Sequence, residues 1–351
     1  MYDQGGMLRD IVKWEYELRG AHQLENIVER GLTIATGAPK GPVYLTLPRE
    51  ILAEALPKPI PFKPDLPLHL PSVPQPDPAA IALLADKLAD AEFPVISSLS
   101  GGADPNSVAV LAALCNDYAI AYADDQARYV SIPASHPMHL GHSLLPVLRE
   151  ADALCFVESD VPWVPDVPQP RADAFVAQCG IDPVYSRYPV RTHRADLLIT
   201  TGTTSLYTAL AHALAARKSR IPKGRFERIA EKSRALSEAR SAATQTELAK
   251  DGPITNLFLS ATLAKITHEN CVLLNEYWAA RDQFAFDAPS SYFYLPASGG
   301  LGWALPAALG AKLVAPQRTY IAAVGDGTYL FSNPAACHHA SQKHNLPVEP
   351  G

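Results

Sequence analysis

The chain has 351 residues, of which 48% are hydrophobic and 19% are charged, with a formal net charge of -6 at pH 7. This length suggests about two or three domains, and the composition is that of a globular enzyme with a large core. There is no basic patch for nucleic acid and no apolar run long enough to predict a membrane span, and the segment 1–20 lacks the apolar core of a signal peptide.

The five cysteines are scattered and include no Cys-x-x-Cys pair. This placement favours reduced thiols that serve as small buried apolar side chains, in a reducing compartment. We therefore expect a cytoplasmic protein.

Residues 1–56 contain one clear helix and one clear strand. Apolar side chains recur at helical spacing at four positions, Leu24, Ile27, Val28 and Leu32. Gly37 can end that helix, and residues 43–47 then predict a short buried strand. A helix and a strand alone bury too little apolar surface to fold by themselves. The segment is therefore interpreted as the C-terminal remnant of a domain.

A proline-rich link follows over residues 57–76. Proline fixes φ and lacks an amide donor, so the link is predicted to be extended and semi-rigid. We expect a central α/β domain over residues 77–216, a polar helical connector over 217–250, and a last domain over 251–351. Acidic residues are interleaved along the connector, which argues against a nucleic-acid-binding arm.

In the central domain, predicted strands alternate with helices, which is typical of a parallel sheet covered on both faces. The expected strands span 93–99, 119–123, 153–158 and 196–200. The turn Ser100-Gly101-Gly102-Ala103 follows the first strand but lacks the complete Gly-x-Gly-x-x-Gly pattern. A tight strand-to-helix turn is favoured there over a nucleotide site.

Three histidines, His136, His139 and His142, recur at a spacing of three. Such spacing could serve a metal. Pro137 and Gly141 interrupt the segment, however, so it is predicted to be a loop, and the sequence favours no metal site in it.

The last domain is predicted as helix, strand, glycine loop, helix, strand, glycine turn and helix. These elements fall near 254–266, 271–274, 299–302, 303–314, 319–324, 325–328 and 334–344. Asn333 is a good N-cap for the final helix, and Pro334 suits its first position.

Asp326 lies between Gly325 and Gly327, at the carboxyl end of an expected parallel strand. Open α/β sheets bind ligands at this edge, and glycines let the backbone approach a ligand closely. The N-terminus of the next helix would suit phosphate, and a carboxylate is the oxygen ligand that Mg²⁺ prefers. The residues thus predict a metal–diphosphate site with Asp326 on the metal, although Gly-Asp-Gly alone is also a common turn.

This last segment resembles the cofactor domain of thiamine-diphosphate-dependent enzymes of the acetolactate synthase, benzoylformate decarboxylase and pyruvate oxidase group. The matching residues are Gly299-Gly300-Leu301-Gly302-Trp303-Ala304-Leu305-Pro306-Ala307-Ala308-Leu309-Gly310 and Val324-Gly325-Asp326-Gly327. The resemblance extends more weakly over nearly the whole chain. It implies successive parallel-sheet domains of α/β class.

The resemblance also implies roles for individual residues. Asp326 would bind Mg²⁺, and Leu301 would be the apolar wedge that bends the thiamine diphosphate. The remaining cofactor contacts would come from Gly300, Gly325, Gly327, Thr328 and Asn275. The sequence after Asn275-Glu276 is Tyr277-Trp278-Ala279. It departs from the family pattern, so the family's side-chain contacts at this point do not carry over.

Two expected parts of the family's site have no counterpart in the sequence. Residues 41–50 resemble the closing strand of the pyrimidine-binding domain, so the activating glutamate is expected before residue 1. The second Mg²⁺ ligand, an asparagine, is expected after residue 351. We therefore expect a chain truncated at both ends with no catalytic residue present, and a homodimer or homotetramer as in the family.

Three functions stay open at this point. The first is a thiamine-diphosphate- and Mg²⁺-dependent enzyme acting on a small 2-oxo acid, by acetolactate-type carboligation or by benzoylformate decarboxylase-like decarboxylation. The second is a non-catalytic fragment or pseudoenzyme of that family. The third, a nicotinamide-dependent oxidoreductase, would need a fingerprint that the sequence lacks. FAD, which some family members bind in the central domain, has no supporting motif.

Overall fold

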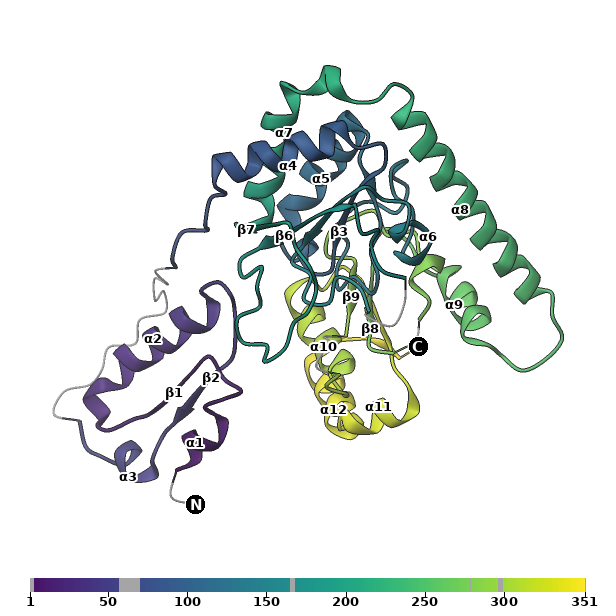
Figure 1. Cartoon of the computed structure of the whole chain (residues 1–351). Coiled ribbons are helices and arrows are strands. Elements are labelled where there is room, and N and C mark those ends of the chain that lie inside the picture. The colour runs from purple at the N-terminus through teal and green to yellow at the C-terminus, as the bar shows by residue number, and fades with distance from the viewer. Residues whose placement is uncertain (1–2, 57–69, 165–167, 278, 296–298, 351) are drawn as a thin grey trace. The chain divides into compact units, whose positions relative to one another are not determined.

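The structure is a computed structural model that describes residues 3–56, 70–164, 168–277, 279–295 and 299–350. Its contacts divide the chain into two units, Met1–Pro74 and Gln75–Gly351 (Figure 1). Most of the expected proline-rich link, residues 57–69, lies outside the described residues. In the described part, no helix combines the length and the apolar character needed to cross a membrane.

Unit 1 is a two-stranded parallel sheet with short helices around it. Its elements are α1 (Gln4–Leu8), β1 (Trp14–Glu17), η1 (Ala21–Gln23), α2 (Leu24–Thr36), β2 (Val43–Thr46) and α3 (Arg49–Leu52). The predicted helix and strand are α2 and β2, whereas β1 was not expected. The Nζ of Lys13 donates to the carbonyls of Ile34 (2.6 Å) and Gly37 (2.8 Å) and so satisfies the C-terminal end of α2.

The central sheet of unit 2 has five parallel strands in the order β4-β3-β5-β6-β7. The strands are β3 (Pro94–Ser98), β4 (Ala121–Tyr122), β5 (Ala153–Val157), β6 (Phe175–Gly180) and β7 (Leu197–Thr200). In chain order this is 2-1-3-4-5, an order of doubly wound sheets. The expected α/β class is therefore confirmed. The sequence analysis missed β6, whose run contains Gln178 and Gly180 and offers no alternation of apolar and polar residues.

Three helices of unit 2 pack together beside this sheet: α4 (Pro78–Asp90), α5 (Pro105–Tyr118) and α7 (Thr203–Ala215) (Figure 1). Each of the first two begins with a proline after an aspartate cap. The Asp77 side chain accepts from the Ala80 amide at 2.8 Å, and the Asp104 side chain accepts from the Asn106 amide. All five cysteines are free and buried, which confirms the expectation that they are reduced thiols serving as small buried side chains.

The 24-residue helix α8 (Arg225–Leu248) occupies most of the segment expected to be a surface connector. Its first residue departs from that expectation, because the Arg225 side chain is 1% exposed. Its guanidinium donates to the carbonyls of Leu88, Ala89 and Ala91 at the end of α4, and to the carbonyl of Tyr118 at the end of α5.

The second sheet of unit 2 has four parallel strands in the order β11-β10-β8-β9. Its strands are β8 (Cys271–Asn275), β9 (Tyr292–Tyr294), β10 (Thr319–Ala323) and β11 (Glu349–Pro350). Its helices are α9 (Asn256–Ala264), α10 (Ala304–Val314), α11 (Asp326–Phe331) and α12 (Pro334–His344). Ala304 and Ala308 of α10 pack against Val272, Tyr320 and Ala322 of the sheet.

Two expectations about these helices are corrected. The residues after Gly325 were expected to form a turn, but they form α11, a helix of six residues that begins at Asp326. Asn333 precedes α12 as expected, yet it has φ 53° and its side chain makes no capping hydrogen bond. The helix that begins beside Asp326 is therefore α11, not the helix that begins after Asn333.

Candidate functional site

The ends of β8 and β10 define one edge of the second sheet. These strands are parallel neighbours with Ala323 opposite Asn275. The amide of Glu276 continues the ladder and donates to the Ala323 carbonyl at 3.0 Å. The two strands thus deliver Glu276 and the segment from Val324 onward to the same edge, as expected for the carboxyl ends of parallel strands.

Glu276 is the residue of this edge that sequence reasoning missed. It is fully buried, and its carboxylate accepts from the amides of Gly302 and Ala304, the latter at 2.7 Å. Ala304 is the first residue of α10, where a negative charge is favoured by the helix dipole. One side chain therefore fixes both the glycine loop and the start of the next helix. The signal in the sequence was an acidic residue directly after a buried strand.

The side chain of Asn275 is used inside the protein. It is 1% exposed, and its amide nitrogen donates to the Ala279 carbonyl (2.8 Å) and to the Tyr292 hydroxyl (3.1 Å). Its amide oxygen accepts from the Ala279 amide at 3.1 Å. These bonds hold the loop after β8, and a direct contact of Asn275 with a cofactor stays a prediction.

Asp326 lies at the first position of α11 with an exposed side chain. One carboxylate oxygen accepts from the Gly327 amide at 2.8 Å, and the other has no hydrogen-bond partner among the described residues. A Cβ added at Gly325 or at Gly327 would have no atom within 4 Å, so the backbone on both sides of Asp326 faces open space. Thr328, by contrast, is buried.

Leu301 and Gly300 lie in the glycine loop before α10. Leu301 is 44% exposed, so it is not part of the core, and a Cβ at Gly300 would again meet no atom within 4 Å. Gly302 has φ 91°, and a Cβ there would be 2.7 Å from the Phe331 carbonyl carbon. The loop therefore packs on the last residue of α11, while Asp326 begins that helix. The six residues of α11 rise about 8 Å along the helix axis, so Asp326 and the contact of the glycine loop lie at opposite ends of this helix.

The glycines of the central domain have a different environment. A Cβ at Gly101 would lie 2.4 Å from the Ser98 hydroxyl, and one at Gly102 would lie 2.2 Å from the Val130 carbonyl oxygen. The protein's own atoms fill the space beside this turn. Glycine is needed there because the chain packs closely on itself, as the interpretation of a tight strand-to-helix turn requires.

The comparisons with known proteins agree with this fold and identify a domain at the end of the chain. Residues 274–348 match the family of the C-terminal TPP-binding domain of thiamine pyrophosphate enzymes. A solved structure from Mycobacterium smegmatis, assigned to the thiamin diphosphate-dependent enzymes, superposes with a TM-score of 0.76 at 19% identity. That superposition covers 99% of this chain and 66% of the other. Residues 274–348 thus belong to the family of the TPP-binding domain, and the chain as a whole has the fold of a solved thiamin diphosphate-dependent enzyme.

The similar curated proteins include a decarboxylase and a synthase. Benzoylformate decarboxylase of Pseudomonas aeruginosa is 25% identical over 346 residues, which cover 93% of this chain and 60% of that protein. A protein of Methanocaldococcus jannaschii assigned as an acetolactate synthase large subunit is 24% identical over 356 residues, which cover 94% of this chain and 58% of that protein. The chain thus spans about 60% of the length of these curated relatives.

Proposed function

We propose that this chain belongs to a thiamine-diphosphate- and Mg²⁺-dependent enzyme that acts on 2-oxo acids, by decarboxylation, carboligation or both. The observation that carries the proposal is the exposed carboxylate of Asp326 between two glycines that face open space, inside the segment matched to the TPP-binding domain. Relatives of both reaction types have nearly equal identity, so the proposal names the substrate class only.

The described residues fit a metal-bound diphosphate. Asp326 would bind Mg²⁺ with its unpartnered oxygen, and the backbone at Gly325 and Gly327 leaves room for the diphosphate. Leu301 presents an apolar side chain to solvent at the other end of α11, where a thiazolium ring could rest on it. When bound, the cofactor supplies an electron sink for the carbanion formed as the 2-oxo acid loses its carboxylate.

The first prediction concerns cofactor binding. Thiamine diphosphate with Mg²⁺ should raise the melting temperature of the chain by roughly 3 °C or more at ligand concentrations about 100 times Kd, because only the folded state binds. Asp326→Asn should abolish the rise, since the amide removes the charge on the metal ligand. The measurement is a thermal melt with cofactor, metal, both or neither.

The control for that experiment is Glu269→Ala, which removes another exposed carboxylate from unit 2 and should leave the shift unchanged. A native chain that shows no shift at millimolar cofactor and Mg²⁺ would contradict the proposal. That result would favour a non-catalytic member of the family, the alternative left open by the sequence.

The second prediction separates binding from folding. In Gly327→Ala the new methyl group meets no protein atom, and alanine favours helix, so the free energy of unfolding without ligand should stay the same or rise by about 1 kcal/mol. The methyl group would nevertheless occupy space proposed for the diphosphate. We therefore expect the cofactor-dependent shift in melting temperature to fall by more than half.

Gly252→Ala is the matched control, because its Cβ position is also free of atoms within 4 Å but lies outside the proposed site. It should keep the full cofactor response. Equal responses of Gly327→Ala and Gly252→Ala would show that the diphosphate does not lie against Gly327.

We further propose that the chain assembles as a homodimer or homotetramer. The support is an apolar surface close to the site: Leu330 and Phe331 of α11 are each 73% exposed, beside the exposed Leu301 of the glycine loop. Exposed apolar side chains gathered in this way are typical of surfaces that another protein chain covers.

A further inference from the structure

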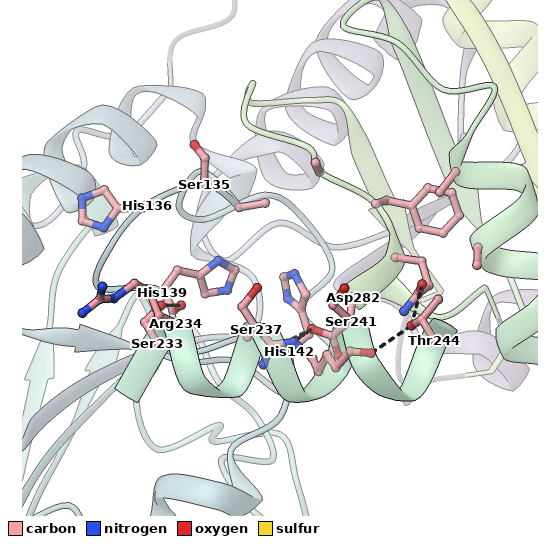
Figure 2. Close-up of a pocket in the computed structure, with 18 of the residues that line it drawn as sticks. Ser135, His136, His139, His142, Ser233, Arg234, Ser237, Ser241, Thr244 and Asp282 are labelled. Carbon is pink, nitrogen blue, oxygen red and sulfur yellow. Dashed lines mark hydrogen bonds and ion pairs between the residues drawn. The ribbon is translucent and has the colours of Figure 1, made fainter. Parts of the chain in front are cut away.

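A second group of side chains that could bind a metal ion lies in unit 2, outside the proposed thiamine site. Asp124, His139 and His142 each offer a ligand atom, and these atoms all lie within 4.8 Å of one another. The two histidines also line a cavity of about 780 Å³ that α8 and α9 border. Figure 2 shows the two imidazole rings side by side above α8, and their centroids are 4.8 Å apart.

The backbone brings these residues together. The segment around His139 runs parallel to β4: the Tyr122 amide donates to the Met138 carbonyl, and the Leu140 amide donates to the Tyr122 carbonyl, both at 2.8 Å. This pairing places both histidines beside Asp124, which follows β4. The spacing of the histidines alone could not show the third side chain, because it comes from another strand.

His139 has a buried ring nitrogen that is open to a ligand. The residue is 6% exposed, and its Nε2 has no hydrogen-bond partner among the described residues. A neutral imidazole presents a lone pair on one ring nitrogen and can bind a metal ion through it. A buried polar atom without a partner is costly, and a bound metal ion would satisfy it.

Asp124 and His142 supply the other ligand atoms. The Asp124 carboxylate lies 2.8 Å from the His142 Nδ1, and both side chains are less than a tenth exposed. Two imidazoles and one carboxylate form a ligand set typical of zinc and related ions.

From this arrangement we propose that Asp124, His139 and His142 form a binding site for a divalent transition-metal ion of the zinc type. The donor atoms lie within 4.8 Å of one another, and small shifts would bring them to roughly 3.3 Å apart, the spacing around a tetrahedral zinc ion with bonds of about 2 Å. The 2.8 Å contact between Asp124 and His142 would open slightly. Because both histidines line the cavity, the remaining coordination position would be reached from the cavity side.

Two arginine side chains near the cluster affect which metal ions it could bind. Arg281 and Arg240 both act electrostatically on His139, and their positive charges oppose a bound cation. Asp282 offsets Arg240, with its carboxylate 3.4 Å from the guanidinium. Nitrogen ligands also disfavour Mg²⁺, which prefers oxygen. The site is therefore selective for transition metals and distinct from the Mg²⁺ site proposed at Asp326.

The test is zinc titration of the full chain after chelator treatment, followed by calorimetry and by melting temperature. The native chain should bind one Zn²⁺ at this site and melt several degrees higher, while Mg²⁺ should not compete. His139→Phe keeps a ring against Tyr122 but removes the nitrogen, and should weaken zinc binding at least about 100-fold. Asp124→Asn keeps an acceptor for His142 and should weaken binding about 10- to 100-fold.

His136→Asn is the matched control, because His136 lies in the same loop but outside the cluster. Its ring accepts from the Met138 amide, and asparagine can also accept there, so zinc binding should be unchanged. Metal-free His139→Phe should melt no lower than the native chain, which shows that it folds. Failure of the native chain to bind zinc would overturn the proposal. So would native-like binding by His139→Phe, which would place the ion on surface histidines such as His338.

Discussion

Replacing Arg225 by alanine is expected to lower the free energy of unfolding by about 3–5 kcal/mol. The Arg225 guanidinium closes the ends of α4 and α5 by donating to four carbonyls, and the side chain is 1% exposed. Burial lowers its pKa to about 10, so it still carries its charge at neutral pH, facing the negative ends of two helix dipoles. Alanine would leave those buried carbonyls without donors.

Urea unfolding followed by circular dichroism measures the effect. Arg228→Ala is the matched control: it lies one turn along the same helix, pairs with Glu92 at 2.6 Å and has a half-exposed side chain. Its loss should cost less than about 1 kcal/mol, as for other surface ion pairs. Equal effects of the two substitutions would show that Arg225 is not the link between α4 and α5.

Glu276→Ala is expected to lower the free energy of unfolding by about 2–4 kcal/mol, because two amides, of Gly302 and Ala304, would lose a buried charged acceptor. Glu276→Gln keeps one oxygen acceptor and should cost less. Both variants should also weaken the response to thiamine diphosphate, because the loop that carries Leu301 would no longer be fixed to the end of β8.

The same urea experiment with and without cofactor checks this. Glu269→Ala, an exposed glutamate close to the start of β8, should change neither quantity. A Glu276→Ala chain with native stability would mean that water replaces the carboxylate at α10 without cost.

Local patterns were enough to predict several elements. The apolar spacing from Leu24 to Leu32 predicted α2, and the apolar run before Gly325 predicted β10. Fold class followed from the alternation of strands and helices, since that pattern repeats along the chain. The metal–diphosphate site at Asp326 was predicted from glycines and one aspartate at a strand end, a signal that lies within a few residues of sequence. The thiamine roles of Leu301 and Asn275 came only from the resemblance to a known family.

Features that depend on distant partners could not be predicted in this way. Arg225 falls in the predicted polar helical connector, and its burial could not be foreseen because its four carbonyl partners lie more than a hundred residues earlier. Glu276 gains its role from a loop 26 residues later. Asp124 joins the two histidines only through pairing beside β4. In each case a polar side chain is explained by tertiary contacts and not by its neighbours in sequence.

The close approach of Gly302 to the backbone of Phe331 and Ser332 has a mechanical consequence. With less than a methyl group of clearance, the glycine loop cannot slide inward unless α11 is displaced with it. Leu301 belongs to that loop and Asp326 begins that helix, so the two ends of the proposed cofactor site are mechanically coupled. We therefore expect a ligand that displaces Leu301 to shift Asp326 as well.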